Sequence, residues 1–164
     1  MTRRIEILLE PRGIRAVAEL LVREKISFGR RSEGLPGSET QVWLGDSMGE
    51  MAAYFTLADV AFIGGSLLPL GGQNLIEAAA CGCPSVVGPH TFNFAEVTEN
   101  LISDGAALRV QNAIELGDTV SRLIGDPASR RRMSDNALAA VERERGAVSR
   151  CVDIVAAVMA GQAP

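Results

Sequence analysis

No lysine or arginine occurs between residues 32 and 108, and within residues 60–95 the only formal charge is Glu77. Glycine and proline interrupt residues 60–95 at nine positions, so this stretch cannot form the continuous apolar helix of about 20 residues that crosses a bilayer. A long uncharged segment divided by glycine is typical of buried parallel strands with loops at their ends. We therefore predict a parallel α/β sheet whose glycine-rich loops mark a ligand site.

The charge balance and the length narrow the class of protein. The chain has 164 residues, of which 47% are hydrophobic, which predicts one globular domain with a sizeable core. Its 16 Lys and Arg against 20 Asp and Glu give a net charge of −4. Nucleic-acid binders need a cationic surface to displace counterions, so we expect no nucleic-acid partner. The apolar run at residues 5–9 is too short for a signal peptide, which predicts a cytoplasmic protein.

Hydrophobic periodicity alternates between strands and helices along the chain. The expected strands are residues 5–9, 26–29, 41–44, 60–63, 84–87 and 107–110. The expected helices are residues 14–25, 47–57 with Ser47 as cap, 74–81, 94–103, 113–124, 127–145 and 147–160. This order predicts an α/β fold, a Rossmann-like parallel sheet with helices on both faces, followed by C-terminal helices.

The three cysteines do not have the spacing of a zinc site. Cys81 and Cys83 are separated by one residue, and Cys151 lies far along the chain without a second ligand pair. We predict that they are small buried hydrophobic residues and that the chain has no metal site.

The segment Gly64-Gly-Ser-Leu-Leu-Pro-Leu-Gly-Gly-Gln-Asn-Leu-Ile-Glu77 contains two glycine pairs beside regular structure. Glycine lets main-chain N–H groups approach an anion, and a helix starting near Asn74 would direct its positive end there. The segment matches neither the G-x-G-x-x-G dinucleotide fingerprint nor a Walker A loop. It predicts a phosphate cradle formed by the main chain.

Several polar residues have both a structural and a functional interpretation. Glu77 follows Asn74 by three residues, so the pair either caps a helix or leaves Glu77 to accept hydrogen bonds from ribose hydroxyls. His90 is either a loop residue bonded to backbone carbonyls or a ligand contact. Asp46 and Glu50 flank an expected helix start, for which we predict a capping role.

Five motifs in order resemble the carboxyl-terminal, donor-binding half of bacterial 3-deoxy-D-manno-octulosonic acid (Kdo) transferases, over most of residues 5–110. They are Arg30-Arg-Ser-Glu-Gly34, Leu44-Gly-Asp-Ser-Met-Gly-Glu50, Gly64-Gly-Ser with Gly71-Gly-x-Asn-x-x-Glu77, Gly82-x-Pro84, and Gly88-Pro-His-x-Phe-Asn-Phe94. The resemblance implies that residues 1–164 form the nucleotide-sugar-binding half of a GT-B glycosyltransferase, an enzyme with two Rossmann-like domains.

The family resemblance also implies a reaction. Kdo passes from CMP-Kdo to a lipid A precursor during lipopolysaccharide synthesis, on the cytoplasmic face of the inner membrane, and the donor CMP-Kdo is a substrate rather than a cofactor. The family's catalytic base and acceptor surface belong to an amino-terminal domain that is absent from this chain. We therefore expect no catalytic residue here and a chain that binds the donor without transferring sugar.

Carried over residue by residue, the resemblance assigns donor contacts to one set of positions. They are Arg12, Gly64, Gly65, Ser66, Gly71, Gly72, Gln73, Asn74, Glu77, His90 and Asn93. Arg12 would pair with the phosphate or the Kdo carboxylate, with Arg30 and Arg31 as further candidates. Two positions depart from the family. After Arg12 the family resemblance leads one to expect histidine and a longer loop, where this chain has Gly13, and Gln73 stands where family members commonly have histidine.

Two other functions remain open from the sequence. The departures at Gly13 and Gln73 favour a non-catalytic nucleotide-binding or regulatory module, and the fold also fits another GT-B relative, such as a UDP-sugar epimerase or an N-acetylglucosaminyl transferase. The last helix has an apolar stripe of Val148, Val152, Val155 and Met159. This stripe either packs on its own domain or causes self-association.

Overall fold

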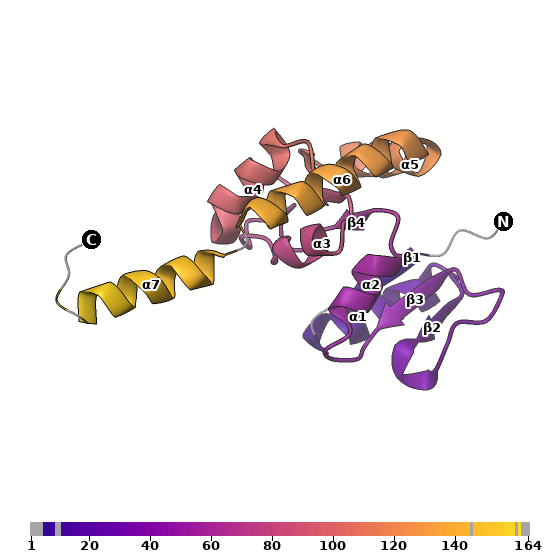
Figure 1. Ribbon diagram of the computed structural model, residues 1–164. Helices are drawn as coiled ribbons and strands as arrows, with labels where there is room; N and C mark the ends of the chain where they lie inside the picture. The colour runs from indigo at the N-terminus through magenta and orange to yellow at the C-terminus, as the bar shows by residue number, and fades with distance from the viewer. Residues whose placement is uncertain (1–4, 9–10, 145, 160, 162–164) are drawn as a thin grey trace. The chain divides into compact units, whose positions relative to one another are not determined.

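The chain forms two compact units, Met1–Tyr54 and Phe55–Pro164, which we call the smaller and the larger unit. The computed structural model describes residues 5–8, 11–144, 146–159 and 161 (Figure 1). Each unit has its own three-stranded parallel sheet. The predicted parallel, Rossmann-like α/β fold is therefore confirmed, with its strands distributed over two sheets.

The smaller unit is built on a sheet in the order β1-β3-β2. Its elements are β1 (Ile5–Leu8), α1 (Pro11–Arg23), β2 (Phe28–Arg30), a 3₁₀ turn η1 (Arg31–Glu33), β3 (Val42–Gly45) and α2 (Met51–Leu57), within which the unit boundary falls. Leu44 of the central strand pairs with both neighbouring strands and is fully buried. Leu21 of α1 packs in the same apolar cluster, so burial of the helix face stabilises the sheet.

The larger unit has the strand order β4-β5-β6. Its elements are β4 (Ala61–Phe62), α3 (Ile76–Ala80), β5 (Ser85–Val87), a 3₁₀ turn η2 (Phe92–Phe94), α4 (Ala95–Ser103), β6 (Ala107–Arg109), α5 (Ala113–Gly125), α6 (Pro127–Glu144) and α7 (Ala147–Met159). Because all three strands run in one direction, the loops after them leave from the same edge of the sheet.

Helices cover both faces of this second sheet. Neighbouring residues of a strand point to opposite faces, and Val86 and Val87 of β5 belong to two different apolar clusters. Val87 packs with Leu101 of α4, whereas Val86 packs with Leu123 of α5. The layered arrangement predicted from the sequence is confirmed in this unit.

Element ends differ from the predicted ones for local reasons. The helix predicted over residues 14–25 begins at Pro11, since proline is favoured in a first helical turn, where no N–H partner is needed. The helix predicted to follow Ser47 begins only at Met51, because Gly49 has φ of +79° and so lies outside the right-handed helical region, and the Ser47 hydroxyl bonds to Glu50 and Tyr54. No helix in the described part of the chain is both long and apolar enough to cross a membrane.

Candidate functional site

The loop after β4 carries both glycine pairs, and two main-chain hydrogen bonds close it on itself. Gly72 N donates to Gly65 O at 3.1 Å, and Gln73 N donates to Gly64 O at 3.1 Å. These two N–H groups are occupied within the loop, so they are not the amides that face an anion. The bonds fix the loop as a compact turn at the carboxyl edge of the sheet.

Ser66 ties this loop to the loop after β5. Its side chain is fully buried, and its hydroxyl donates to Ile63 O and accepts from Gly88 N at 2.8 Å. Ser66 O also accepts a hydrogen bond from His90 N at 2.9 Å. A Cβ atom at residue 88 would overlap the main chain of Ser66, so only glycine fits there. The Ser66 hydroxyl therefore joins the two loops and is shielded from solvent.

Asn93 makes a second connection between the same two loops. Its side-chain Nδ2 donates to the carbonyls of Leu70 and Gly72 at 3.3 and 3.4 Å, and its main-chain N–H donates to Gly71 O at 3.1 Å. Gly71 has φ of +90°, and a Cβ atom there would overlap the Asn93 side chain. Asn93 is thus seated against the glycine loop, while part of it remains exposed.

The segment after the glycine loop enters a short helix. Asn74 Oδ1 accepts from Ile76 N at 2.9 Å, and its Nδ2 donates to Glu77 Oε1 at 3.3 Å. The helix predicted from residue 74 begins at Ile76 and has five residues. Leu75 occupies the cap position without a side-chain hydrogen bond, and Asn74, one residue earlier, bonds to the first N–H of the helix and to the Glu77 side chain. Glu77 is exposed at this edge, so its assignment to a ribose stays a prediction.

The remaining predicted contacts of the larger unit lie on these loops. Gln73 is exposed. His90 is half-buried and lies close to the glycine loop, because a Cβ atom placed on Gly72 would be 3.5 Å from the His90 carbonyl oxygen. The structure thus brings the predicted positions from residue 64 to residue 93 onto one sheet edge. Their contacts with a donor stay predictions.

Arg12 differs from the other predicted contacts because it lies in the smaller unit. It occupies the first turn of α1, where the sequence predicted a loop, and its side chain lies outside the described residues. Its predicted pairing with a phosphate or a carboxylate therefore stays a prediction.

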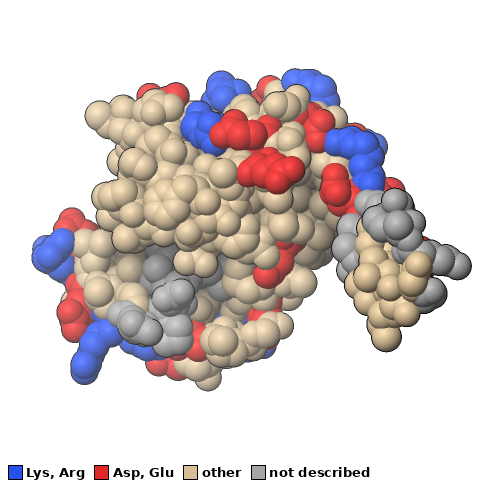
Figure 2. Space-filling view, turned by 90° about the vertical axis from the view of Figure 1, so that its left-hand side faces the viewer, with Lys and Arg blue, Asp and Glu red and all other residues tan. Residues whose placement is uncertain are grey.

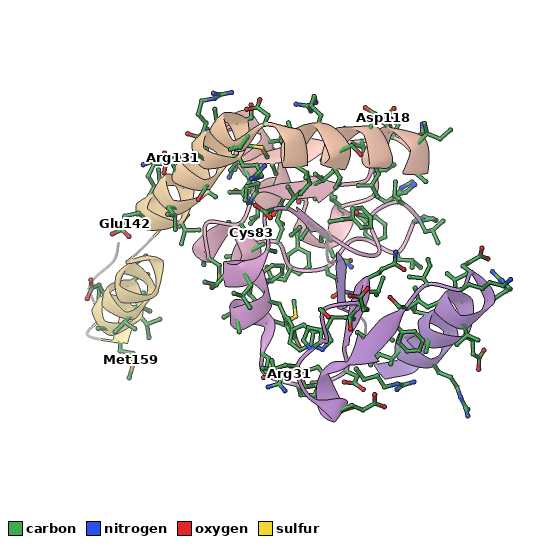
Figure 3. All side chains as sticks on the ribbon, turned by 90° about the vertical axis from the view of Figure 1, so that its right-hand side faces the viewer. Arg31, Cys83, Asp118, Arg131, Glu142 and Met159 are labelled. Carbon is green, nitrogen blue, oxygen red and sulfur yellow. The ribbon has the colours of Figure 1, made fainter. Side chains whose placement is uncertain are left out.

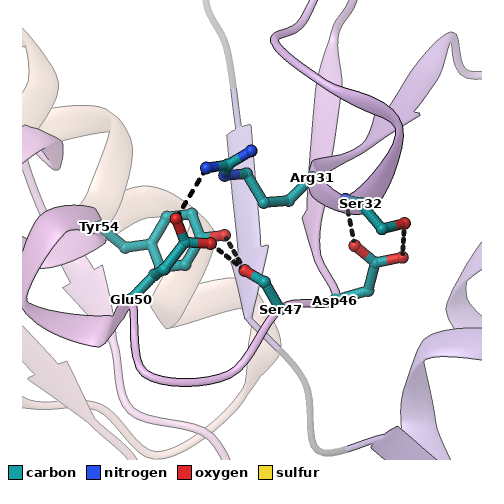
Figure 4. Close-up of polar contacts among 6 residues, drawn as sticks. All are labelled: Arg31, Ser32, Asp46, Ser47, Glu50 and Tyr54. Atoms are coloured by element: carbon teal, nitrogen blue, oxygen red, sulfur yellow. Dashed lines mark hydrogen bonds and ion pairs between the residues drawn. The ribbon is translucent and has the colours of Figure 1, made fainter.

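Arg30 and Arg31, the other two cationic candidates, already pair with acids of the smaller unit. Arg30 lies 3.7 Å from Asp46. Arg31 lies 2.8 Å from Glu50 (Figure 4). The guanidinium of Arg31 also lies over the Trp43 ring, 5.9 Å from its centroid. These pairs stabilise the loops after β2 and β3 and neutralise both arginines locally.

Asp46 and Glu50 do not have the helix-capping role predicted for them. Asp46 accepts from the main-chain N–H and the hydroxyl of Ser32 at 2.8 and 2.7 Å, and Ser47 donates its hydroxyl to Glu50 (Figure 4). The hydrogen bonds from Ser32 lower the pKa of Asp46, and those from Ser47 and Arg31 lower the pKa of Glu50. Both carboxylates thus link the end of β3 to neighbouring segments.

The sequence reasoning missed Arg109, the last residue of β6. Arg109 donates to the Thr91 hydroxyl at 3.3 Å and to Glu99 at 2.7 Å, beside the loop that carries His90 and Asn93. The signal in the sequence was its place, because Arg109 is the first cation after residues 32–108 and lies within the strand predicted over residues 107–110. In agreement with the long stretch without cations in the sequence, the face drawn in Figure 2 has a broad area without Lys, Arg, Asp or Glu side chains.

A shallow apolar groove lies beside the glycine loop. It has a volume of about 510 Å³, and its lining includes Phe62, Leu68 and Leu70 together with Gln111 and Asn112. Asn112 also caps α5, because its Oδ1 accepts from Ile114 N and Glu115 N, both at 3.0 Å. The lining of the groove therefore combines exposed apolar side chains with one polar side chain, Asn112, that is held by hydrogen bonds.

Cys83 has the buried, structural role predicted for it. The side chain lies within the core of the larger unit, and burial raises the pKa of its thiol to about 12 (Figure 3). Cys81 is half-buried, and Cys151 lies outside the residues whose side chains are described. Among the described residues, no three His, Cys, Asp or Glu side chains gather as metal ligands.

Comparison with known proteins identifies the family. The sequence model of the family "Glycosyl transferases group 1" matches residues 25–139. The 3-deoxy-D-manno-octulosonic acid transferase of Bordetella pertussis is 47% identical over 130 residues, covering 78% of this chain and 30% of that protein. Its counterpart in Haemophilus influenzae is 39% identical over 147 residues, covering 88% of this chain and 34% of that protein. The chain thus spans about a third of the length of these curated relatives.

A solved structure agrees with the sequence matches. The C-terminal CMP-Kdo binding domain of WaaA from Acinetobacter baumannii superposes with a TM-score of 0.76 at 33% identity, covering 80% of this chain and 69% of that domain. The fold and the sequence therefore lead to the same relatives. This chain belongs to the glycosyl transferases group 1 family and is a homologue of the Kdo transferases.

Proposed function

We propose that residues 1–164 are the donor-binding domain of a Kdo transferase and that they bind CMP-Kdo at the carboxyl edge of the larger unit's sheet. The observation that carries the proposal is the similarity to the A. baumannii CMP-Kdo binding domain, which extends over 80% of this chain. The glycine loop lies where ligands bind in parallel α/β sheets, outside the carboxyl ends of the strands.

The connections between the loops support this assignment physically. Ser66 and Asn93 hold the loops after β4 and β5 together before any ligand arrives, so little ordering is left for the ligand to bring about. Main-chain N–H groups of the glycine loop other than those of Gly72 and Gln73 are the proposed phosphate donors. The exposed Glu77 carboxylate is the proposed acceptor for the ribose hydroxyls.

In the full reaction, the acceptor would be a lipid A precursor, bound by a part of the enzyme that corresponds to the amino-terminal domain of the family. That part would also supply the base that takes the proton of the acceptor hydroxyl. We propose that this happens on the cytoplasmic face of the inner membrane. The 164-residue chain would bind donor without transferring Kdo.

Titration calorimetry of the chain with CMP and with UMP tests the proposal. CMP is expected to bind in the millimolar range or tighter, and more strongly than UMP, and no Kdo transfer is expected from the purified chain. Absence of CMP binding at millimolar ligand would overturn donor binding, and a preference for UMP would favour another GT-B relative. Turnover by the chain alone would contradict the assignment of the base to another domain.

Glu77→Ala separates the two roles of that residue. If Glu77 holds ribose, its loss weakens CMP binding by about tenfold, equivalent to about 1.4 kcal/mol, with little change in stability. If Glu77 only supports the helix start, the melting temperature falls and CMP affinity is unchanged. Glu96→Ala is the matched control, because Glu96 is an exposed glutamate in the first turn of α4 and lies outside the predicted site.

A further inference from the structure

Arg109 ends the strand beside the one that leads into the loop of residues 88–94. In the register of the larger unit, Arg109 pairs with Val87, the last residue of β5. The loop therefore leaves the sheet directly beside Arg109. An arginine at this place can reach both the loop and the helix that follows it.

The guanidinium of Arg109 is held between that loop and α4. It donates to Thr91 Oγ1 at 3.3 Å and to Glu99 Oε1 at 2.7 Å, and 27% of its side chain is exposed. Thr91 is buried, with 8% of its surface exposed, so its hydroxyl is a fixed partner. The Arg109 Nε atom is buried and has no hydrogen-bond partner among the residues that the structure describes. Partial burial of a guanidinium is costly, so these two contacts constrain where it lies.

Thr91 transmits this constraint to the glycine loop. A Cβ atom on Gly72 would lie 3.7 Å from Thr91 Cα and 3.5 Å from His90 O, which shows how closely the two loops pack. Two residues further on, Asn93 is bonded to the main chain of Leu70, Gly71 and Gly72. Restraining Thr91 therefore restrains both neighbours that carry predicted donor contacts.

We propose that Arg109 is a positioning residue of the donor site, which acts through Thr91 to hold His90 and Asn93 against the glycine loop. The proposal rests on the proposed donor binding. Arg109 itself touches no donor in this scheme. Loss of Arg109 leaves the fold intact but makes the loop of residues 88–94 less ordered. Ligand binding must then order this loop, which makes the free energy of binding less favourable.

The test compares Arg109→Gln, Thr91→Val and the double variant with the unchanged chain. Calorimetry measures CMP affinity, and hydrogen exchange measures protection of the amides of residues 89–94. Arg109→Gln is expected to weaken CMP binding by about tenfold and to raise exchange in that segment. Because both single changes break the same contact, the double variant should bind CMP about as weakly as Arg109→Gln.

Arg143→Gln is the matched control. It removes another ion pair, between Arg143 of α6 and Asp104, the residue that follows α4, and neither residue belongs to the loop of residues 88–94. This variant should bind CMP within about twofold of the unchanged chain, the deviation expected of an independent site. Arg109→Lys keeps the cation and should recover part of both the affinity and the protection, which rules out a general loss of folding as the cause.

Three results would overturn the proposal: unchanged CMP affinity of Arg109→Gln, additive effects of the two single changes, or unchanged exchange in residues 89–94. If the unchanged chain binds no CMP, the proposed function fails. The exchange measurement still decides whether Arg109 holds the loop.

Discussion

At the scale of single residues, the loops after β4 and β5 pack closely at two positions where only glycine fits. Gly88 lies against the main chain of Ser66, and Gly71 lies against the side chain of Asn93. The sequence could indicate that these glycines matter, because they occur in pairs beside strands. It could not indicate which atoms exclude a Cβ, since those atoms come from a loop more than 20 residues away. The burial of the Ser66 hydroxyl was missed for the same reason.

Gly88→Ala tests this close approach. The added methyl group must displace the main chain of Ser66, so the free energy of unfolding should fall by about 1–3 kcal/mol, the usual cost of overpacking. Urea denaturation measures it. Gly117→Ala is the control, because Gly117 lies in α5 with no atom near its Cβ position, and this change should stabilise the chain by up to about 1 kcal/mol. Equal stability of the two variants would contradict the close approach.

At the scale of elements, hydrophobic periodicity was sufficient to find the strands and helices. What it missed were polar side chains that bond across elements. Asp46 looked like a helix cap because it precedes a helix, yet Ser32 from the loop after β2 supplies its hydrogen bonds. Arg109 was missed because only strand pairing brings it beside Thr91. Such partners depend on sheet register, which the sequence pattern does not specify.

Because Asp46 and Glu50 of the smaller unit are hydrogen-bonded as carboxylates, we predict that the protein loses stability in acid. Hydrogen bonds lower the pKa values of Asp46 and Glu50 from their ordinary values of 3.8 and 4.5. Their stabilisation is therefore present above those values and is lost as the pH falls through the lowered ones. Trp43, the single tryptophan, is buried in this unit, so its fluorescence should report the acid transition. The Asp46→Asn and Glu50→Gln double variant should be less stable at pH 7 and show a weaker pH dependence. An unchanged acid transition would contradict this role.

At the scale of the whole molecule, the length correctly indicated a chain able to form a core, but it could not indicate that the contacts separate into two units, Met1–Tyr54 and Phe55–Pro164. The length alone also could not indicate that the related proteins are longer than this chain. The matched relatives are more than twice as long, so the remaining part of a complete enzyme is where we place the acceptor and the base.

We predict that the chain self-associates through its last helix, α7. Val152, Val155, Val158 and Met159 are each more than half exposed, and an apolar group of this kind promotes contact between copies. Val148 of the predicted stripe lies outside the described side chains. Light scattering should show a mass that rises with concentration, and Val155→Glu should reduce the rise. Leu35→Glu, at an isolated exposed leucine, should leave it unchanged. A monomer at high concentration would contradict the prediction.

The close fit of Gly88 against Ser66 also limits how such a chain can change over evolutionary time. A side chain at residue 88 cannot be accepted while the loop after β4 keeps its course, because the two main chains occupy adjoining space. Substitution at residue 66 would likewise remove the partner of the Gly88 N–H. The two loops are therefore expected to diverge together, so that relatives with a different residue at one position carry a compensating change in the other loop.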